Sequence, residues 1–116
     1  MHPQSSYSCR TAEQYVRSML ATLGYDSFRV LHALCPINLI AWKDRNQILF
    51  VQVRLKRSFK DTRAFQENIK ELCQFVREGR YPGEIQLWMK TGKVWIRYAI
   101  SSYGAMPISW GRADDS

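Results

Sequence analysis

Residues 36–57 read PINLIAWKDRNQILFVQVRLKR, two apolar runs on either side of a polar segment. The apolar runs cover residues 37–42 and 48–55, and both are rich in branched aliphatic and aromatic side chains. Each run is too short for an ordinary helix. Residues 44–47 between them, Asp-Arg-Asn-Gln, are typical of a turn. The stretch therefore predicts a β-hairpin around which the rest of the chain is organised.

The second strand of this hairpin alternates between apolar and polar residues. Successive side chains of a strand point to opposite faces, so one face of this strand packs and the other presents a polar stripe. The stripe consists of Gln52, Arg54 and Lys56, in the most basic part of the chain. A functional site is expected there.

Two amphipathic segments flank the hairpin. Apolar residues at helical spacing predict a first helix over residues 11–24, with Thr11 as N-cap in a capping box and a glycine as the stop. A second helix is predicted to begin at Asp61 or Thr62 and to end at Gly79.

Strand patterns complete the predicted fold. Residues 28–34 alternate as a strand before the hairpin, and residues 84–89 and 93–100 form a second hairpin. The predicted order is αβββαββ, which defines an α/β (α+β) fold with a mixed sheet of about five strands flanked by helices.

The chain length suits a single domain. Its 116 residues allow one core, which we place at residues 11–100, between a flexible N-terminal segment (residues 1–10) and a C-terminal tail (residues 101–116). Neither a signal peptide nor an apolar run approaching the roughly 20 residues of a membrane span is present. We therefore expect a soluble, cytoplasmic protein without membrane contact.

The three cysteines, Cys9, Cys35 and Cys73, are far apart and show no CxxC spacing. This pattern favours reduced thiols over a disulfide framework or a zinc site.

A net charge of +7 and a pI near 9.6 favour an anionic partner, most commonly nucleic acid. Basic residues gather around the second hairpin strand and the segment after it, and an alternative interpretation is a solvated loop with charges that protect an edge strand. The predicted nucleic-acid-binding residues are Lys43, Arg45, Arg54, Lys56, Arg57, Lys60 and Arg63. Contacts of this kind are made to phosphates and give affinity without sequence preference.

The element order and the hairpin residues resemble the PD-(D/E)xK nuclease superfamily, in particular its archaeal Holliday junction resolvase-like branch. That family has an aspartate in the hairpin region, a (D/E/Q)xK tripeptide on the next strand and often a glutamate on the first helix. This chain has Asn38 in the aspartate position, Gln52-Val-Arg54 in the tripeptide position and Glu13 on the helix. The resemblance covers about residues 11–100 and implies a restriction-endonuclease-like core.

The resemblance makes Glu13, Asn38, Gln52 and Arg54 the candidate catalytic positions, and the first three the candidate metal ligands. Magnesium prefers carboxylate oxygens, and in such a site it activates a water and neutralises the scissile phosphate. An amide oxygen is a weaker ligand than a carboxylate, and the Arg54 guanidinium cannot carry a proton. We therefore expect lost or impaired phosphodiesterase activity, with Mg²⁺ as cofactor only if the site is active.

Three functions follow from these observations. The first is a DNA-binding protein of the nuclease fold, including branched DNA among its ligands, with a degenerate site. The second is an active Mg²⁺-dependent, resolvase-like endonuclease, which would need a further carboxylate such as Asp26 or Asp44 near Gln52. The third is a non-catalytic assembly subunit, for which a homodimer is plausible.

The hairpin register decides whether the candidate residues meet. A regular four-residue loop at residues 44–47 would set Asn38 opposite Val53 and away from Gln52 and Arg54. An odd-length loop or a bulge would bring the three together. We expect one of these two arrangements.

Overall fold

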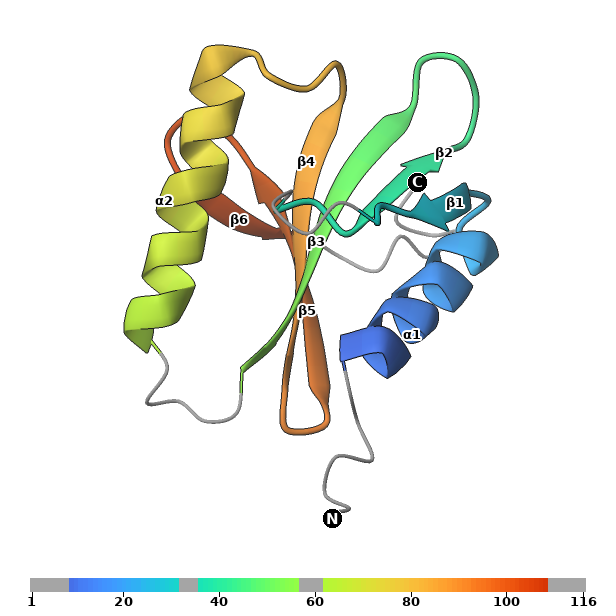
Figure 1. Cartoon of the computed structure of the whole chain (residues 1–116), viewed down its shortest axis with the longest axis horizontal. Helices are drawn as coiled ribbons and strands as arrows, with labels where there is room; N and C mark the ends of the chain where they lie inside the picture. Colours follow the sequence, from blue (N-terminus) through green and yellow to red (C-terminus); the bar gives the residue numbers. More distant parts are fainter. Residues whose placement is uncertain (1–8, 32–35, 57–61, 109–116) are drawn as a thin grey trace.

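The fold is built around a long central strand, β3 (Ile48–Lys56), in a computed structural model that describes residues 9–31, 36–56 and 62–108 (Figure 1). The other elements in chain order are α1 (Cys9–Thr22), β1 (Asp26–Arg29), β2 (Leu39–Trp42), α2 (Thr62–Glu78), β4 (Glu84–Thr91), β5 (Val94–Ile100) and β6 (Ala105–Ile108). No helix among the described residues is long and apolar enough to span a membrane.

Within the described residues the strands form one six-stranded sheet in the order β1-β2-β3-β4-β5-β6. β3 and β4 are parallel and joined through α2, and every other neighbouring pair is antiparallel. The predicted mixed sheet flanked by helices is therefore confirmed.

The strand count needs a correction, because the segment expected to be a tail from residue 101 contains β6. Its four residues, Ala-Met-Pro-Ile, pair with β5 at the edge of the sheet. Pro107 is compatible with an edge strand, where one N–H has no ladder partner.

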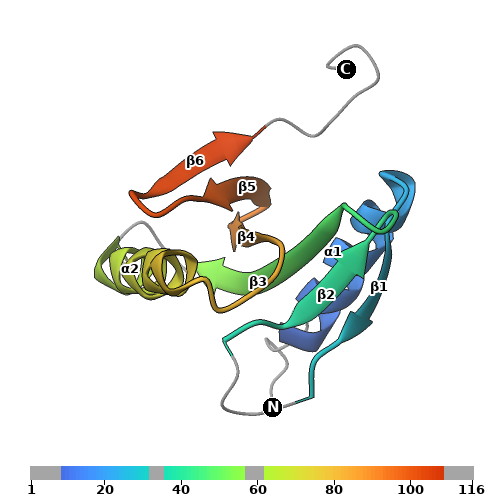
Figure 2. The same cartoon turned by 90° about the horizontal axis from the view of Figure 1, so that it is seen from above.

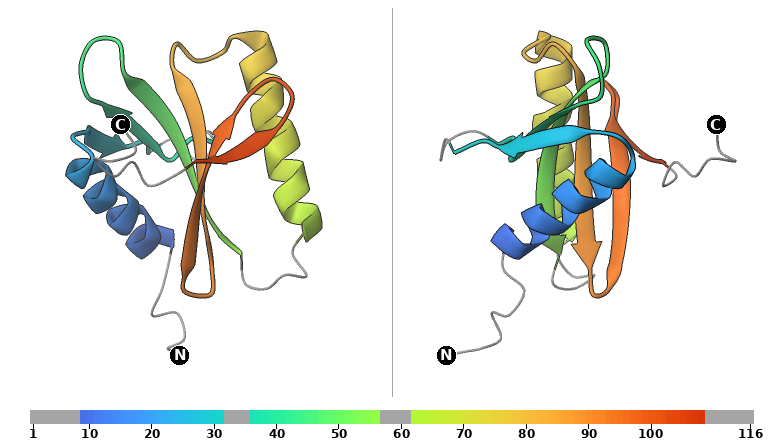
Figure 3. Two further views of the ribbon diagram at one scale, coloured as in Figure 1. Left: turned by 180° about the vertical axis from the view of Figure 1, so that it is seen from behind. Right: turned by 90° about the vertical axis from the view of Figure 1, so that its right-hand side faces the viewer.

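The two helices lie on opposite faces of the sheet, as Figure 3 and the view from above in Figure 2 show. On the α1 face, Val16 and Leu20 pack against Val51, Val53 and Trp88. On the α2 face, a second cluster joins residues of α2 to apolar side chains of β3, β4 and β5. The alternation predicted for β3 is thus confirmed on its apolar side.

Both helices end at the predicted glycines. Gly24 has φ 95° and the next N–H donates to the Leu20 carbonyl at 2.9 Å; Gly79 has φ 63° and the next N–H donates to the Phe75 carbonyl at 3.1 Å. These are Schellman ends, in which a left-handed residue favours glycine.

The predicted helix and strand starts need corrections. α1 begins by Cys9, so Thr11 lies inside the helix and is not its N-cap. β1 covers Asp26–Arg29 instead of residues 28–34, of which residues 32–35 lie outside the described residues. The proposed cap Asp61 also lies outside them.

The β2–β3 loop has an odd length, as one of the two expected arrangements requires. Trp42 pairs with Ile48, which leaves the five residues from Lys43 to Gln47 in the loop. The Lys43 N–H donates to the Gln47 carbonyl at 3.0 Å, and the Asn46 N–H donates to the Asp44 side chain at 2.8 Å.

A bulge also interrupts the hairpin, just before β2. Leu39 pairs with Val51, and the Asn38 N–H donates to the same Val51 carbonyl at 2.8 Å. Two consecutive residues therefore lie opposite one, as in a β-bulge. In consequence Ile37 packs on the α2 side while Leu39, two residues later, packs on the α1 side.

Candidate functional site

Asn38 occupies the bulge and is held from three directions. Its N–H donates to Val51, its carbonyl accepts from the Val30 N–H at 2.8 Å, and its side-chain Oδ1 accepts from the Val53 N–H at 2.7 Å. The side chain thereby continues the β2–β3 ladder by one step. The carboxamide is fixed beside the part of β3 that carries the tripeptide.

Arg54 reaches the same oxygen. Its guanidinium NH1 lies 3.3 Å from Asn38 Oδ1 and donates to the Val53 carbonyl at 2.9 Å. Burial lowers the pKa of Arg54, and the fields of Cys9, Glu71 and Glu13 oppose this shift. Among the described residues no carboxylate lies within ion-pair distance of Arg54. The site therefore contains a half-buried cation that no carboxylate of the described residues neutralises directly.

Gln52 is buried, which corrects the prediction that the whole polar stripe faces outward. Gln52 is 0% exposed, in the middle of β3 between β2 and β4. Nε2 donates to the Pro36 carbonyl at 3.0 Å, while Oε1 is a buried acceptor without a partner in the described part of the chain. The hydrogen bond to Pro36 ties β3 to the segment before β2.

Glu13 is buried on the second turn of α1 and pairs with Arg29 of β1. Arg29 Nε donates to Glu13 Oε1 at 2.7 Å. The helix starts before the predicted position, so Glu13 is not a first-turn acid and helix-dipole stabilisation does not account for it. The sequence prediction missed Arg29. The sequence did contain a signal for Arg29, because its strand directly precedes the hairpin. Antiparallel pairing with the first hairpin strand sets Arg29 opposite Leu39.

The residues present do not fit a magnesium site. The Asn38 oxygen is already an acceptor for Val53 and Arg54, and the Glu13 carboxylate is paired with Arg29. A guanidinium next to the shared oxygen opposes a divalent cation by direct repulsion. No group of three His, Cys, Asp or Glu side chains that could hold an ion occurs in residues 9–31, 36–56 and 62–108.

The two further carboxylates considered for an active site lie at the other end of β2. Asp26 pairs with Trp42, and Asp44 is in the β2–β3 loop, whereas Asn38 precedes the first residue of β2. Neither is placed beside Gln52.

The predicted basic residues divide between the two ends of β3. Lys43 and Arg45 belong to the β2–β3 loop, whereas Lys56 is the last residue of β3, roughly 26 Å away along an extended strand. Arg63 lies in the first turn of α2, next in sequence to Ala64, which lines one hollow together with Lys56. Arg57 and Lys60 lie outside the described residues.

A basic group missed by the sequence prediction lies at the Lys56 end. Lys56 pairs in register with Thr91, the last residue of β4; Lys90 precedes Thr91 in that strand, and Lys93 lies in the β4–β5 turn. Its Nζ lies 5.4 Å from the centre of the Phe65 ring. The element order contained the signal, because a parallel β3–β4 pair brings the ends of both strands together.

A small hollow connects Arg54 to this basic end. It measures about 170 Å³ and lies between β3 and the first turns of α2. Its walls include Arg54, Lys56, Phe65 and Asn68. Two cations and an amide facing one hollow suit an anionic oxygen ligand.

The arrangement of two helices on a mixed sheet, with the candidate residues at the bulged hairpin, is a restriction-endonuclease-like fold. The structure is similar to that of Hjc, a Holliday junction resolvase from the archaeal hyperthermophile Archaeoglobus fulgidus. The TM-score is 0.56 at 16% sequence identity, over 88% of this chain and 85% of that chain. At this identity the likeness concerns the fold. No protein-family model matches the chain, and no curated protein is similar to it in sequence.

Proposed function

We propose that this protein binds DNA, including branched DNA, through the surface around Arg54 and the Lys56 end of β3, with little or no phosphodiesterase activity. The observation that carries the proposal is the position of Arg54. Its guanidinium is bonded to Asn38, half-buried and without a carboxylate in ion-pair distance among the described residues. A charge that is removed from water without a counter-ion is costly, and a phosphate oxygen would relieve this cost.

The same arrangement supports binding without a divalent ion. In a metal-dependent nuclease the ion neutralises the phosphate, whereas here a side chain supplies a fixed positive charge next to the Asn38 oxygen. Arg63, Lys90 and Lys93 extend the positive charge along the end of the sheet. The fold similarity to a Holliday junction resolvase is consistent with branched DNA as the ligand, although it concerns the fold alone.

The test is a titration of a labelled four-way junction and a matched duplex, followed by fluorescence anisotropy, in EDTA and in magnesium. We expect salt-sensitive binding that EDTA leaves unchanged. Arg54→Gln should weaken it and make the slope of log K against log salt shallower by about 0.9, the value for one phosphate contact on duplex DNA. Arg45→Gln removes the same charge from the far loop and serves as the matched control.

Two outcomes would contradict the proposal. One is binding that requires magnesium, and the other is an equal effect of the Arg54→Gln and Arg45→Gln substitutions. A cleavage assay on the same DNA adds a direct comparison with the triple variant Asn38→Asp, Gln52→Glu, Arg54→Lys. Cleavage by the native protein that Glu13→Ala abolishes would establish the active endonuclease instead.

A further inference from the structure

A groove of about 360 Å³ runs between α2 and the β5–β6 turn, away from Asn38 and Arg54. Phe65 and Ile69 of α2 and Tyr98 of β5 line it, and Tyr103 of the turn stands at its rim. The rings of Phe65 and Tyr98 touch, with 5.4 Å between their centres. The groove therefore offers aromatic surface from two elements that are far apart in the sequence.

A second hollow of about 230 Å³ shares Phe65 and Tyr98 with this groove and extends it towards the β4–β5 turn. Exposed apolar side chains of β5 border it, with Val94 59% and Ile96 37% exposed. Both hollows are lined by Phe65 and Tyr98, and we refer to the two adjoining hollows together as the channel.

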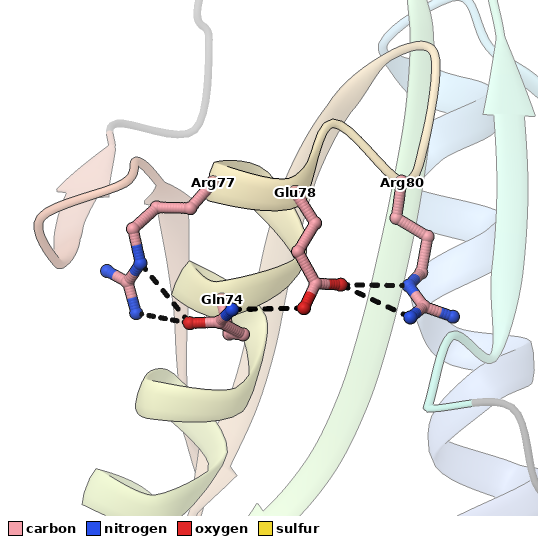
Figure 4. Close-up of polar contacts among 4 residues, drawn as sticks. All are labelled: Gln74, Arg77, Glu78 and Arg80. Atoms are coloured by element: carbon pink, nitrogen blue, oxygen red, sulfur yellow. Dashed lines mark hydrogen bonds and ion pairs between the residues drawn. The ribbon is translucent and has the colours of Figure 1, made fainter.

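Tyr103 is 97% exposed, yet its turn is well fixed. Ser101 Oγ accepts from the N–H groups of Tyr103 and Gly104 at 3.1 and 3.2 Å. Arg77 of α2 donates from NH1 to the Ser102 carbonyl at 2.6 Å, and Gln74 orients the same guanidinium (Figure 4). An aromatic ring presented to solvent on a fixed turn is a stacking platform with little ordering cost.

The charged side chains that line the channel are cations. Lys70 and Arg77 line the first hollow and Lys56 the second, and among the described residues neither lining includes an aspartate or glutamate. Glu78, next to Arg77 in sequence, accepts from Gln74 and Arg80, and Gln74 accepts from Arg77 (Figure 4). Cations and aromatic rings in one channel match a ligand that carries both phosphates and bases.

We propose that this channel binds single-stranded nucleic acid, with bases on Tyr103 and the Phe65–Tyr98 pair and phosphates at Lys70 and Arg77. The channel adjoins the hollow at Arg54 and shares Lys56 and Phe65 with it, but Tyr103, Tyr98, Lys70 and Arg77 lie outside that hollow, so the inference goes beyond the proposed function. An unpaired strand leaving a DNA branch would meet both surfaces, because Lys56 and Phe65 line the hollow at Arg54 as well as the channel.

The test is the anisotropy of a fluorescein-labelled oligo(dT) titrated with the full chain. We expect Tyr103→Leu to weaken binding about tenfold, equivalent to about 1.4 kcal/mol, since one stacked base is lost. Tyr103→Phe keeps the ring and should stay within about twofold of the native affinity. Lys70→Gln should make the salt slope shallower by about 0.7, the single-strand value for one phosphate, and Arg45→Gln should leave it unchanged.

The outcomes separate this inference from the proposed function. Tyr103→Leu should leave four-way-junction binding nearly unchanged, and Arg54→Gln should leave oligo(dT) binding nearly unchanged. Absence of oligo(dT) binding at low salt, or equal affinities for the native protein and Tyr103→Leu, would overturn the inference and leave an apolar peptide as the alternative occupant. The inference would also be overturned if Tyr103→Leu and Arg54→Gln each weakened the binding of oligo(dT) and of the four-way junction equally, because the channel would then not be a distinct site.

Discussion

Replacing Asn38 with aspartate (Asn38→Asp) is expected to stabilise the fold at neutral pH. The asparagine oxygen already accepts hydrogen bonds from the Val53 N–H at 2.7 Å and from Arg54 at 3.3 Å. A carboxylate of the same shape would keep both contacts and add a negative charge beside a guanidinium that has no carboxylate in ion-pair distance among the described residues. The substitution therefore converts an amide–guanidinium hydrogen bond into an ion pair without changing the packing.

The size of the effect follows from these contacts. A hydrogen bond to a charged group contributes about 1.5–3 kcal/mol, against about 0.5–1.5 kcal/mol for a neutral one. The gain applies fully at Val53 and only partly at the longer Arg54 contact, and the desolvation of the carboxylate offsets part of it. We expect a net increase of about 1 kcal/mol in the free energy of unfolding. This corresponds to a lowering of the pKa of the new carboxylate by about 0.7 unit on folding.

The pH dependence of the stability gain tests whether the new negative charge causes it. The new carboxylate would have a folded-state pKa below its unfolded value of about 3.9, so the gain is present above about pH 4 and is lost as pH falls through the folded pKa. Urea unfolding of both proteins near neutral pH and near pH 3 measures it. In an Arg54→Met background the gain should shrink. A destabilised variant at neutral pH, or a gain of undiminished size in the Arg54→Met background, would refute the reasoning.

Three further predictions concern the fold. Glu13→Gln should lower the free energy of unfolding by about 1 kcal/mol, because it leaves Arg29 unpaired beside a buried position; a double-mutant cycle with Arg29→Gln checks this, and additive effects would contradict it. Gly83→Ala should cost about 2 kcal/mol or more in thermal unfolding, since its Cβ would overlap the Ile48 carbonyl oxygen; an unchanged melting temperature would disprove the close approach. Burial raises the pKa of the Cys73 thiol, so native stability should fall as pH rises above about 8.5, where only the unfolded thiol ionises, and Cys73→Ala should remove that dependence.

Local patterns predicted the elements whose signal lies within one segment. Helical spacing and a glycine stop located the ends of α1 and α2, since a left-handed residue is required there. The bulge at Asn38 carried no such signal. The run from Ile37 to Trp42 is apolar at nearly every position, so alternation could not show that the chain changes face between Ile37 and Leu39.

The sequence predicted which residues share the polar face of β3, but not how deeply each is buried or which elements lie beside it. The polar alternation set Gln52 and Arg54 apart from Val51 and Val53, yet it could not show that Gln52 would be fully buried. Basic residues close in sequence were treated as one patch, whereas a nine-residue strand separates Lys43 from Lys56. The groove beside Tyr103 depends on a β6 strand that its four residues alone did not reveal.

The parallel pairing of β3 with β4 divides the sheet into two sets of antiparallel strands, β1–β3 and β4–β6. Glu13, Asn38, Gln52 and Arg54 all belong to the first half, which ends with β3, and α2, β5 and β6 of the second half build the aromatic channel. Each half forms its own antiparallel meander, and the β3–β4 pairing joins the two meanders into one sheet. The charged and amide groups at Asn38 and the aromatic surface at Tyr103 are therefore built on different meanders of that sheet.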